Sequence, residues 1–340
     1  SGYFMSVNRN KESMSLNLKT EQGKEIFCEL VKKSDVLVEN FRPGTMEKIG
    51  FYFQELKKMN PRLVYTSVSG YGHTGPYRHK PAYDIIVQAL GGIMSITGEH
   101  KGGPVKIGAS MGDITAGLFA AIGTLAALSH VDKGGEGQHV DISMLDSQVA
   151  ILENAISRYF LNGEIPGPIG NRHPSITPFC SLPSADGNLV IAVGNDAMWK
   201  KFCILLNRLD LLDNNKFKTN TERTTYWEEL QEILEPIFQE RSTTDWLELL
   251  EEGGIPCGPI QSIDQVVSHP QILSRNMIVE LEHPKAGTIK VANNPIKFST
   301  TPCEEITKHP PLFGQHTESI LQELGYSKSM IDEFIDNQVV

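Results

Sequence analysis

The sequence has no excess of basic residues, and this absence removes one class of protein. Lys and Arg total 31 against 41 for Asp and Glu, so the formal net charge is −10 at pH 7. Generic nucleic-acid binding needs a basic face, because Lys and Arg hold the phosphate backbone. We therefore expect no nucleic-acid partner. An anionic ligand would have to bind at a local cluster of Lys and Arg side chains.

Paired cysteines and metal motifs are also missing. The cysteines are odd in number, widely spaced and without a C-x-x-C pair: Cys28, Cys180, Cys203, Cys257 and Cys303. This spacing favours neither a disulfide framework nor a zinc site and is typical of a reducing compartment, the cytoplasm or, in a eukaryote, the mitochondrial matrix. H-E-x-x-H, G-x-S-x-G and P-loop motifs do not occur, so metal catalysis and a serine triad have little support.

Long hydrophobic runs are absent as well. The most apolar stretch, from Ala116 to Leu128, is shorter than the ~20 residues that cross a bilayer. It predicts a tightly packed core helix of a soluble protein with no membrane partner. Ser1 to Phe4 lack the basic and apolar regions of a signal peptide. Because the chain starts at the edge of a patterned segment without an initiator Met, we expect sequence upstream of it.

The first half of the chain alternates strands and helices. A composition of 40% hydrophobic and 21% charged residues over 340 positions is ordinary for a globular protein of about two domains. The predicted strands are 14–18, 36–38, 63–68 and 139–142, with 36–38 buried on both faces. Predicted helices follow Thr20 and cover 85–96, 113–128 and 145–159. This order is typical of a mostly parallel, Rossmann-like α/β sheet flanked by helices.

The character of the sequence changes near Asp186. A strand at 189–193 is followed by helices at 197–206, 226–238 and 243–250, a hairpin over 277–281 and 288–291, and a Pro-rich link (Pro302, Pro310, Pro311) to two terminal helices. We predict a large α/β domain over 1–185, a smaller α+β domain over 186–300, and a C-terminal helical segment over 301–340 that returns to the large domain.

A G-x-G-x-x-G sequence at Gly70–Gly75 follows a predicted strand. A dinucleotide site also needs a helix to begin inside this motif, so that its amides meet the pyrophosphate. Here the next residues, 76–81, are typical of a loop, and the next helix begins only near Tyr83. The glycines therefore favour a tight loop, and NAD or FAD binding is not expected.

Cations gather in the predicted loops of the first third: Lys19, Arg42, Lys48, Arg78 and Lys80. Open α/β sheets bind ligands in the loops that follow their strands. The cluster would suit a polyanionic small molecule, although surface Lys and Arg without a ligand would give the same pattern.

Two aspartates stand at expected helix starts. Asp113 follows the small residues 108–112 and precedes an Ala- and Gly-rich helix, and Asp146 lies between a strand and a helix. Each has two interpretations, a helix N-cap or a nucleophilic carboxylate. A helix N-terminus stabilises negative charge, so either would be ionised at pH 7. Only the glycine-rich setting of Asp113, which would let a substrate approach closely, distinguishes them.

Nine short segments follow one another along nearly the whole chain: 6–11 (SVNRNK), 16–20 (LNLKT), 38–44 (VENFRPG), 69–72 (SGYG), 81–84 (PAYD), 112–113 (GD), 134–138 (GGEGQ), 170–174 (GNRHP) and 311–317 (PLFGQHT). In this order they resemble the class III CoA-transferases, the formyl-CoA-transferase-like family of the CaiB/BaiF type. Each segment is short, but the ordered set is specific.

The resemblance implies the chemistry of the site. Asp113 would be the nucleophilic aspartate, which takes part in moving CoA from an acyl-CoA to a carboxylic acid, and Asp146 would be a helix cap. CoA contacts would come from Leu16, Asn17, Leu18, Lys19, Asn40, Phe41, Arg42, Lys48, Pro81, Ala82, Tyr83 and Asp84. CoA is then a substrate, with no prosthetic group and no metal. Two chains would interlock into a homodimer.

Other interpretations stay open beside this one. Family members begin with a strand-and-helix unit that this chain lacks, so an inactive CoA-binding dimer is one alternative. Another is an α-methylacyl-CoA racemase-like isomerase of the same family, whose His–Asp step resembles Tyr83-Asp84; a phenol is a poor base at neutral pH. From their polar loop, Arg172 and His173 are expected to orient the acceptor carboxylate. Succinate, oxalate, glutarate and carnitine-like acids are all family substrates.

Overall fold

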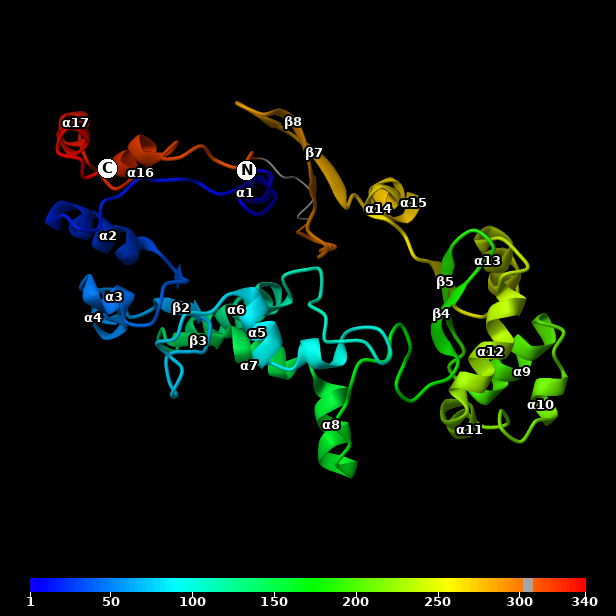
Figure 1. Ribbon diagram of the computed structural model, residues 1–340. Coiled ribbons are helices and arrows are strands. Elements are labelled where there is room, and N and C mark those ends of the chain that lie inside the picture. The colour runs from blue at the N-terminus through cyan, green and yellow to red at the C-terminus, as the bar shows by residue number, and fades with distance from the viewer. Residues whose placement is uncertain (302–307) are drawn as a thin grey trace. The chain divides into compact units, whose positions relative to one another are not determined.

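The structure, a computed structural model, describes residues 1–301 and 308–340, so Pro302 and Cys303 lie outside the described residues. Two compact units make up the chain (Figure 1). Unit 1 comprises Ser1–Gly91, Ala109–Ile151 and Asp264–Val340, and unit 2 comprises Gly92–Gly108 and Leu152–Ile263. The predicted domains 1–185, 186–300 and 301–340 stay a prediction.

A parallel sheet of three strands lies in unit 1, as the alternation of strands and helices predicts. The strands are β1 (Val36–Glu39), β2 (Val64–Ser69) and β3 (His139–Ser143), with β2 in the middle. The helices nearest to them in sequence are α2 (Glu21–Lys33), α3 (Thr45–Lys48), α4 (Phe53–Met59), α5 (Asp84–Leu90) and α6 (Met111–Asp132). The expectation that 36–38 is buried on both faces is wrong, because Val38 is 62% exposed.

Helix α2 begins where the sequence predicts. Thr20 Oγ1 accepts a hydrogen bond from the Gly23 N–H at 3.0 Å, which satisfies a backbone donor that no helical carbonyl can reach. A Cβ atom at Gly23 would lie 2.1 Å from the Asn17 carbonyl oxygen, so this position requires glycine. Ile26 and Val31 of α2 are buried in two core clusters.

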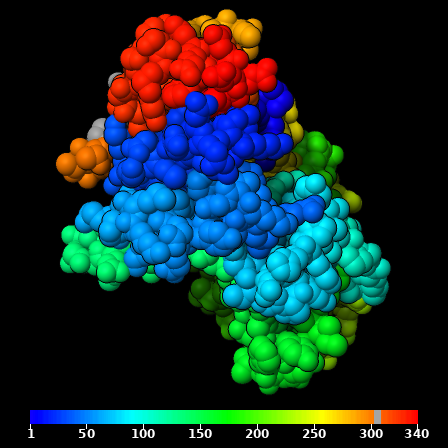
Figure 2. All heavy atoms as spheres, turned by 90° about the vertical axis from the view of Figure 1, so that its left-hand side faces the viewer, coloured from blue at the N-terminus to red at the C-terminus, as the bar shows by residue number. Residues whose placement is uncertain are grey.

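The predicted strand 14–18 is wrong. The Asn17 N–H donates to the Val339 carbonyl at 2.8 Å, and Met14 and Leu16 pack against the cluster that contains Ile26. Figure 2 shows the atoms of the C-terminal helices, in red, directly against those of α2, in blue. These helices are α16 (Thr317–Glu323) and α17 (Lys328–Asp336). The alternating apolar residues therefore contact a helical layer rather than a neighbouring strand.

Helix α6 packs against β2 and β3 through small residues. At Gly123 a Cβ atom would lie 2.9 Å from Val140 Cγ1, so glycine allows the close approach of helix and sheet. The opposite face is apolar and exposed at Ile114, Leu118 and Ile122. By length and composition alone α6 could cross a membrane, and 28% of its most apolar 18-residue segment is buried. The expectation of a tightly packed core helix is therefore wrong for this chain by itself.

Two predicted helices are interrupted. The segment 85–96 forms α5 and then a short 3-10 helix, η1 (Ile93–Ile96), because Gly92 between them has a φ of 87°. The segment 145–159 forms two helices, α7 (Met144–Ala150) and α8 (Glu153–Asn162). Of these, η1 and α8 belong to unit 2. Unit 1 also contains α1 (Gly2–Val7), α15 (Pro270–Ser274) and the predicted hairpin of β7 (Ile278–His283) and β8 (Gly287–Ala292), and α14 (Ile263–Ser268) begins at the unit boundary.

Unit 2 combines an antiparallel sheet with helices. Its strands are β4 (Phe179–Pro183), β5 (Asn188–Ala192) and β6 (Cys257–Pro259), and its helices include α9 (Asp196–Leu205), α10 (Asp210–Asp213), α11 (Asn220–Thr225), α12 (Trp227–Phe238) and α13 (Thr243–Glu252). Its core combines aliphatic and aromatic side chains, with Phe238 stacked on Trp246 at 4.4 Å between ring centroids. Fully buried Arg223 donates to Asp196 Oδ1 at 2.7 Å and to the Thr177 carbonyl at 2.7 Å.

Candidate active site

The carboxyl ends of the parallel strands bring several predicted site segments to one edge of the sheet. Glu39 of β1 lies opposite Ser67 of β2, and Ser69 of β2 lies opposite Ser143 of β3. The loop 40–42 leaves β1 at this edge, and Asn40 Nδ2 donates to the Val68 carbonyl at 2.6 Å. Ligands of open parallel sheets bind at such an edge. The sheet therefore supports this loop as a binding segment.

A group of buried and half-buried polar side chains lies next to the loop 40–42, and no sequence pattern predicted it. Glu39 Oε2 accepts the Phe41 N–H at 2.6 Å, and His73 Nε2 lies 3.8 Å from Glu39 Oε1. Ser67 Oγ and His139 Nε2 are 2.6 Å apart. Burial raises the pKa of Glu39, although the Phe41 N–H opposes this, and burial together with the charge of His73 lowers the pKa of His139.

The glycine loop 70–75 is a loop, as predicted. Gly72 and Gly75 have φ values of 78° and 79°, and α5 begins only at Asp84. The His73 N–H donates to the Asp141 carboxylate at 3.0 Å, so the loop is tied to β3. No helix begins within the motif that could direct its amides at a pyrophosphate.

Some side chains of the predicted CoA contacts pack into the protein interior, and others are exposed. Leu16 and Leu18 pack into core clusters, and Ala82 lies against Gly70. In contrast, the side chains of Lys19, Phe41, Arg42, Lys48 and Tyr83 are exposed. Leu18 packs on the same cluster as Met46 of α3, so the segment 16–19 lies near the helix that carries Lys48. The assignment of all these residues to CoA stays a prediction.

Asp113 is the third residue of α6, and its side chain is exposed. The N-cap is Ser110, so Asp113 is not a cap. Asp146 is likewise the third residue of α7, where Ser143 Oγ accepts the Asp146 N–H at 3.1 Å. The expected capping role of Asp146 is therefore wrong. Both carboxylates lie in a first helical turn, so this position alone does not separate them.

The backbone just before Asp113 is held by a second helix, α5. The Gly112 N–H donates to Asp84 Oδ1 at 2.8 Å, and Gln88 Nε2 donates to Asp84 Oδ2 at 2.9 Å. Both of these side chains are buried. Asp113 thus follows a buried backbone segment that a hydrogen bond holds in place. The Asp84 carboxylate accepts two hydrogen bonds from within the protein. A contact of Asp84 with CoA stays a prediction.

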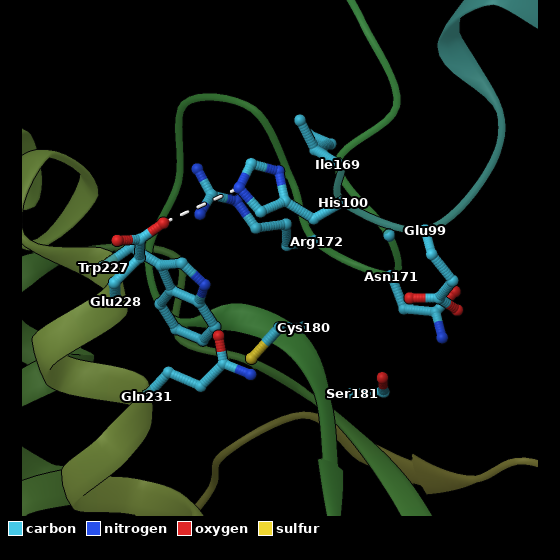
Figure 3. A pocket seen from close by; sticks show the side chains of 11 residues that line it. Glu99, His100, Ile169, Asn171, Arg172, Cys180, Ser181, Trp227, Glu228 and Gln231 are labelled. Atoms are coloured by element: carbon cyan, nitrogen blue, oxygen red, sulfur yellow. Dashed lines mark ion pairs between the residues drawn. The ribbon is translucent and has the colours of Figure 1, made fainter. Parts of the chain in front are cut away.

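A separate pocket in unit 2 contains Arg172 (Figure 3). The Arg172 guanidinium lies 5.5 Å from the centre of the Trp227 ring, and burial lowers its pKa. Figure 3 shows His100 beside it, with the His100 Nε2 to Glu228 Oε1 distance of 3.7 Å as a dashed line. The His173 Nδ1 accepts the Ser175 and Ile176 N–H groups at 3.2 and 3.1 Å, and its role toward the acceptor stays a prediction.

No metal site or disulfide is found in the part of the chain that the structure describes. Within residues 1–301 and 308–340, no group of three His, Cys, Asp or Glu side chains could hold a metal ion. Cys28, Cys180, Cys203 and Cys257 are free thiols. Burial raises the pKa of Cys180 to about 12, so this thiol is a poor nucleophile at neutral pH.

Residues 1–317 match the model of CoA-transferase family III, and the chain belongs to this family. It is 39% identical to a succinyl-CoA:glutarate CoA-transferase of Mus musculus, over 100% of this chain and 78% of the relative. It is 41% identical to an acetyl-CoA:oxalate CoA-transferase of Acetobacter aceti, over 87% and 75%. A crystal structure of a CAIB/BAIF family protein from Brucella suis has a TM-score of 0.84 at 35% identity and covers 95% of this chain and 84% of its own.

The predicted family is therefore confirmed, and the protein is an enzyme of the class III CoA-transferases that acts on CoA thioesters. The mixed α/β fold with a parallel sheet is confirmed as well.

We expect protonation of His139 to lower the stability of the sheet. Its folded pKa is depressed, so the unfolded chain binds the proton more tightly, and stability falls as pH drops below about 6.5. Glu39 acts oppositely, since its raised pKa gives stability that is lost as pH rises above about 4.5. Urea unfolding at about pH 7.5 and pH 5.5 should show a smaller loss of stability in His139→Gln than in wild type.

The matched control is His79→Gln, because His79 is exposed and is not part of the group formed by Glu39, His73 and His139. It should keep the pH dependence of the wild type. An equal loss of stability in wild type and His139→Gln would contradict the role of burial at His139.

Proposed function

We propose that this protein transfers CoA from an acyl-CoA to a small carboxylic acid through a covalent intermediate on Asp113. The observation that carries the proposal is an exposed carboxylate in the first turn of a long helix, directly after a buried and hydrogen-bonded glycine. The relatives are named for succinyl-CoA or acetyl-CoA as donor and glutarate or oxalate as acceptor. By analogy with them, the acceptor is a dicarboxylic acid.

The proposed reaction passes through two mixed anhydrides of Asp113, first with the donor acid and then with the acceptor acid. An Asp113 carboxylate oxygen attacks the thioester carbonyl, the C–S bond breaks, and CoA leaves as a thiolate. The thiolate then attacks the Asp113 carbonyl of the anhydride, which releases the donor acid and leaves an aspartyl-CoA thioester. The acceptor carboxylate attacks this thioester, and the released thiolate attacks the acceptor carbonyl. The new acyl-CoA departs, and Asp113 is again a free carboxylate.

The chain's own residues suit this chemistry. A carboxylate in the first turn of a 22-residue helix is stabilised as an anion, so no general base is needed to activate it. The anhydride and the aspartyl-CoA thioester both hydrolyse readily, so water must be kept out while they exist. Small residues shortly before Asp113, Gly108 to Ser110, would let a substrate lie close to the backbone.

The phosphates of CoA would be held by the exposed cations. Lys19, Arg42 and Lys48 have no ion pair with another side chain among residues 1–301 and 308–340. Their positive charge is therefore available to a polyanion, although the chain as a whole carries a net charge of −10. Backbone groups of the loop 40–42 would lie beside them.

A homodimer belongs to the same proposal. The exposed side of α6 carries Ile114, Leu118, Ile122 and Leu125, which are 48 to 65% exposed. In aqueous solution, an apolar helix face of this extent is usually covered by another protein surface. A second copy of this chain, interlocked with the first as the family resemblance implies, would cover it and would shield Asp113 from water.

Replacing the nucleophile should abolish transfer without unfolding the chain. We expect Asp113→Ala to lower kcat by on the order of 10³-fold or more, because no other group replaces the covalent carrier. Asp146→Ala, which removes an exposed carboxylate from the same position of α7, should leave kcat unchanged. Intact-mass spectrometry after incubation with acyl-CoA should detect an adduct on Asp113 in wild type. Turnover of Asp113→Ala within about tenfold of wild type would contradict the proposal.

Removing a phosphate-binding cation should affect binding more than chemistry. We expect Lys19→Ala and Lys48→Ala each to raise KM for the acyl-CoA donor by roughly tenfold, with a smaller change in kcat. Lys290→Ala, which removes an exposed cation of β8, serves as the control in steady-state kinetics. Unchanged donor KM in both variants would remove these residues from the CoA site.

Arg172 should act on the acceptor alone. If its guanidinium holds an acceptor carboxylate, Arg172→Met should raise acceptor KM by roughly tenfold. Formation of the aspartyl adduct from acyl-CoA in the absence of acceptor should proceed at the wild-type rate. Arg208→Met removes an arginine that is paired with Asp210 in the same unit and is the control. Identical acceptor kinetics in Arg172→Met and wild type would contradict this role.

A further inference from the structure

Helix α6 begins without a capping side chain of its own. Ser110 occupies the N-cap position, but its side chain makes no capping hydrogen bond. The first N–H groups of a helix have no partner inside the helix, and a buried N–H without a partner costs free energy. For Gly112 the partner comes from a different helix, because Asp84 Oδ1, at the first residue of α5, accepts its N–H at 2.8 Å.

Asp84 is itself held in place from its own helix. Gln88 lies one turn further along α5 and is fully buried. Its Nε2 donates to Asp84 Oδ2 at 2.9 Å and also to the Ala109 carbonyl at 3.3 Å. A reversed Gln88 amide would place its oxygen against these two acceptors. One orientation of Gln88 therefore satisfies both, and it ties Asp84 to the residues just before α6.

The third helix of this junction is α7. Gln148, also fully buried, donates from Nε2 to the Met111 carbonyl at 3.2 Å and to Thr115 Oγ1 at 3.1 Å. Thr115 Oγ1 in turn donates to the Met111 carbonyl at 2.6 Å. The turn that carries Asp113 is thus held from α5 on one side and from α7 on the other.

Close packing at Gly112 makes this turn intolerant of displacement. A Cβ atom at Gly112 would lie 2.5 Å from Val87 Cγ2 and 3.1 Å from Asp84 Oδ1. Helix α5 therefore lies directly on the backbone of α6, one residue before Asp113. A buried carboxylate at such a contact fixes direction as well as distance, because its oxygen must point at the N–H that it accepts.

We propose that Asp84 is a positioning residue for CoA transfer. Its buried carboxylate sets the place and direction of the first turn of α6, and through it the direction in which the Asp113 carboxylate leaves the helix. The inference rests on the proposed role of Asp113 as nucleophile. A nucleophile held in its attacking geometry reacts faster than one that must first be oriented. Loss of the contact should therefore lower kcat and leave CoA affinity unchanged.

Asp84→Asn is the sharpest test, because it keeps the shape of the side chain. Its amide nitrogen must face either the Gly112 N–H or the Gln88 Nε2 group, so one donor always meets another donor. We expect kcat to fall about 10- to 100-fold, with donor KM within about twofold of wild type. Amide hydrogen exchange of the peptide 109–116, followed by mass spectrometry of the full chain, should become faster.

The matched control is Asp146→Asn, an exposed carboxylate in the first turn of α7. It should keep wild-type kcat, KM and exchange. If Asp84→Asn does not fold, Gln88→Met replaces it, since this variant leaves the Asp84 to Gly112 hydrogen bond but releases Asp84 Oδ2. A lower kcat with unchanged donor KM in that variant supports the proposal as well.

Three results would overturn the inference. The first is a raised donor KM with unchanged kcat in Asp84→Asn, which would make Asp84 a CoA contact. The second is wild-type kcat and exchange in Asp84→Asn, and the third is wild-type kcat in Gln88→Met when Asp84→Asn does not fold. An active Asp113→Ala would instead overturn the proposed function, so the two failures are distinguishable. Inactive Asp113→Ala together with fully active Asp84→Asn overturns only the positioning role.

Discussion

The first turn of α6 is the constraint on which the candidate site depends. A nucleophilic carboxylate needs an open path for its substrate, yet it also needs a rigid base. In unit 1 these demands are divided between adjacent residues. Gly112 is buried, lies against α5 and donates to the Asp84 carboxylate, whereas the side chain of Asp113 is exposed. Because the helix continues for 22 residues and packs on β2 and β3, its start cannot shift without disturbing the sheet.

The same division recurs at the end of β1. Glu39 lies behind the loop 40–42 and accepts the Phe41 N–H, and Asn40 donates to the Val68 carbonyl. These two side chains hold the backbone of the loop, while Phe41 and Arg42 are exposed. Polar side chains thus hold the backbone of each segment, and exposed side chains lie beside them. Both segments lie at carboxyl ends of a parallel sheet, where α/β enzymes bind their substrates.

The fold was predictable wherever a local signal coincided with its tertiary environment. Thr20 does cap α2, the segments 36–38, 63–68 and 139–142 are strands, and the loop 70–75 has no helix within it. The segment 14–18 alternates as a strand does but contacts a helical layer formed about 300 residues later in the chain, which no local pattern can reveal. Val38 and the outer face of α6 are apolar but exposed. An apolar pattern predicts that a side chain tends to be buried, but it does not identify the surface that buries it.

The sequence by itself determined the class of the enzyme, since the nine ordered segments require no coordinates to recognise. It also predicts the binding loops, because glycine, proline and cations mark them locally. Only the tertiary structure showed that the start of α6 is held by other helices. Asp84 and Gln88 come from α5 and Gln148 comes from α7, so they meet the start of α6 only when these helices pack together. The local sequence predicts where a helix starts, but the hydrogen bonds that hold that start in place form between segments that are distant in the chain.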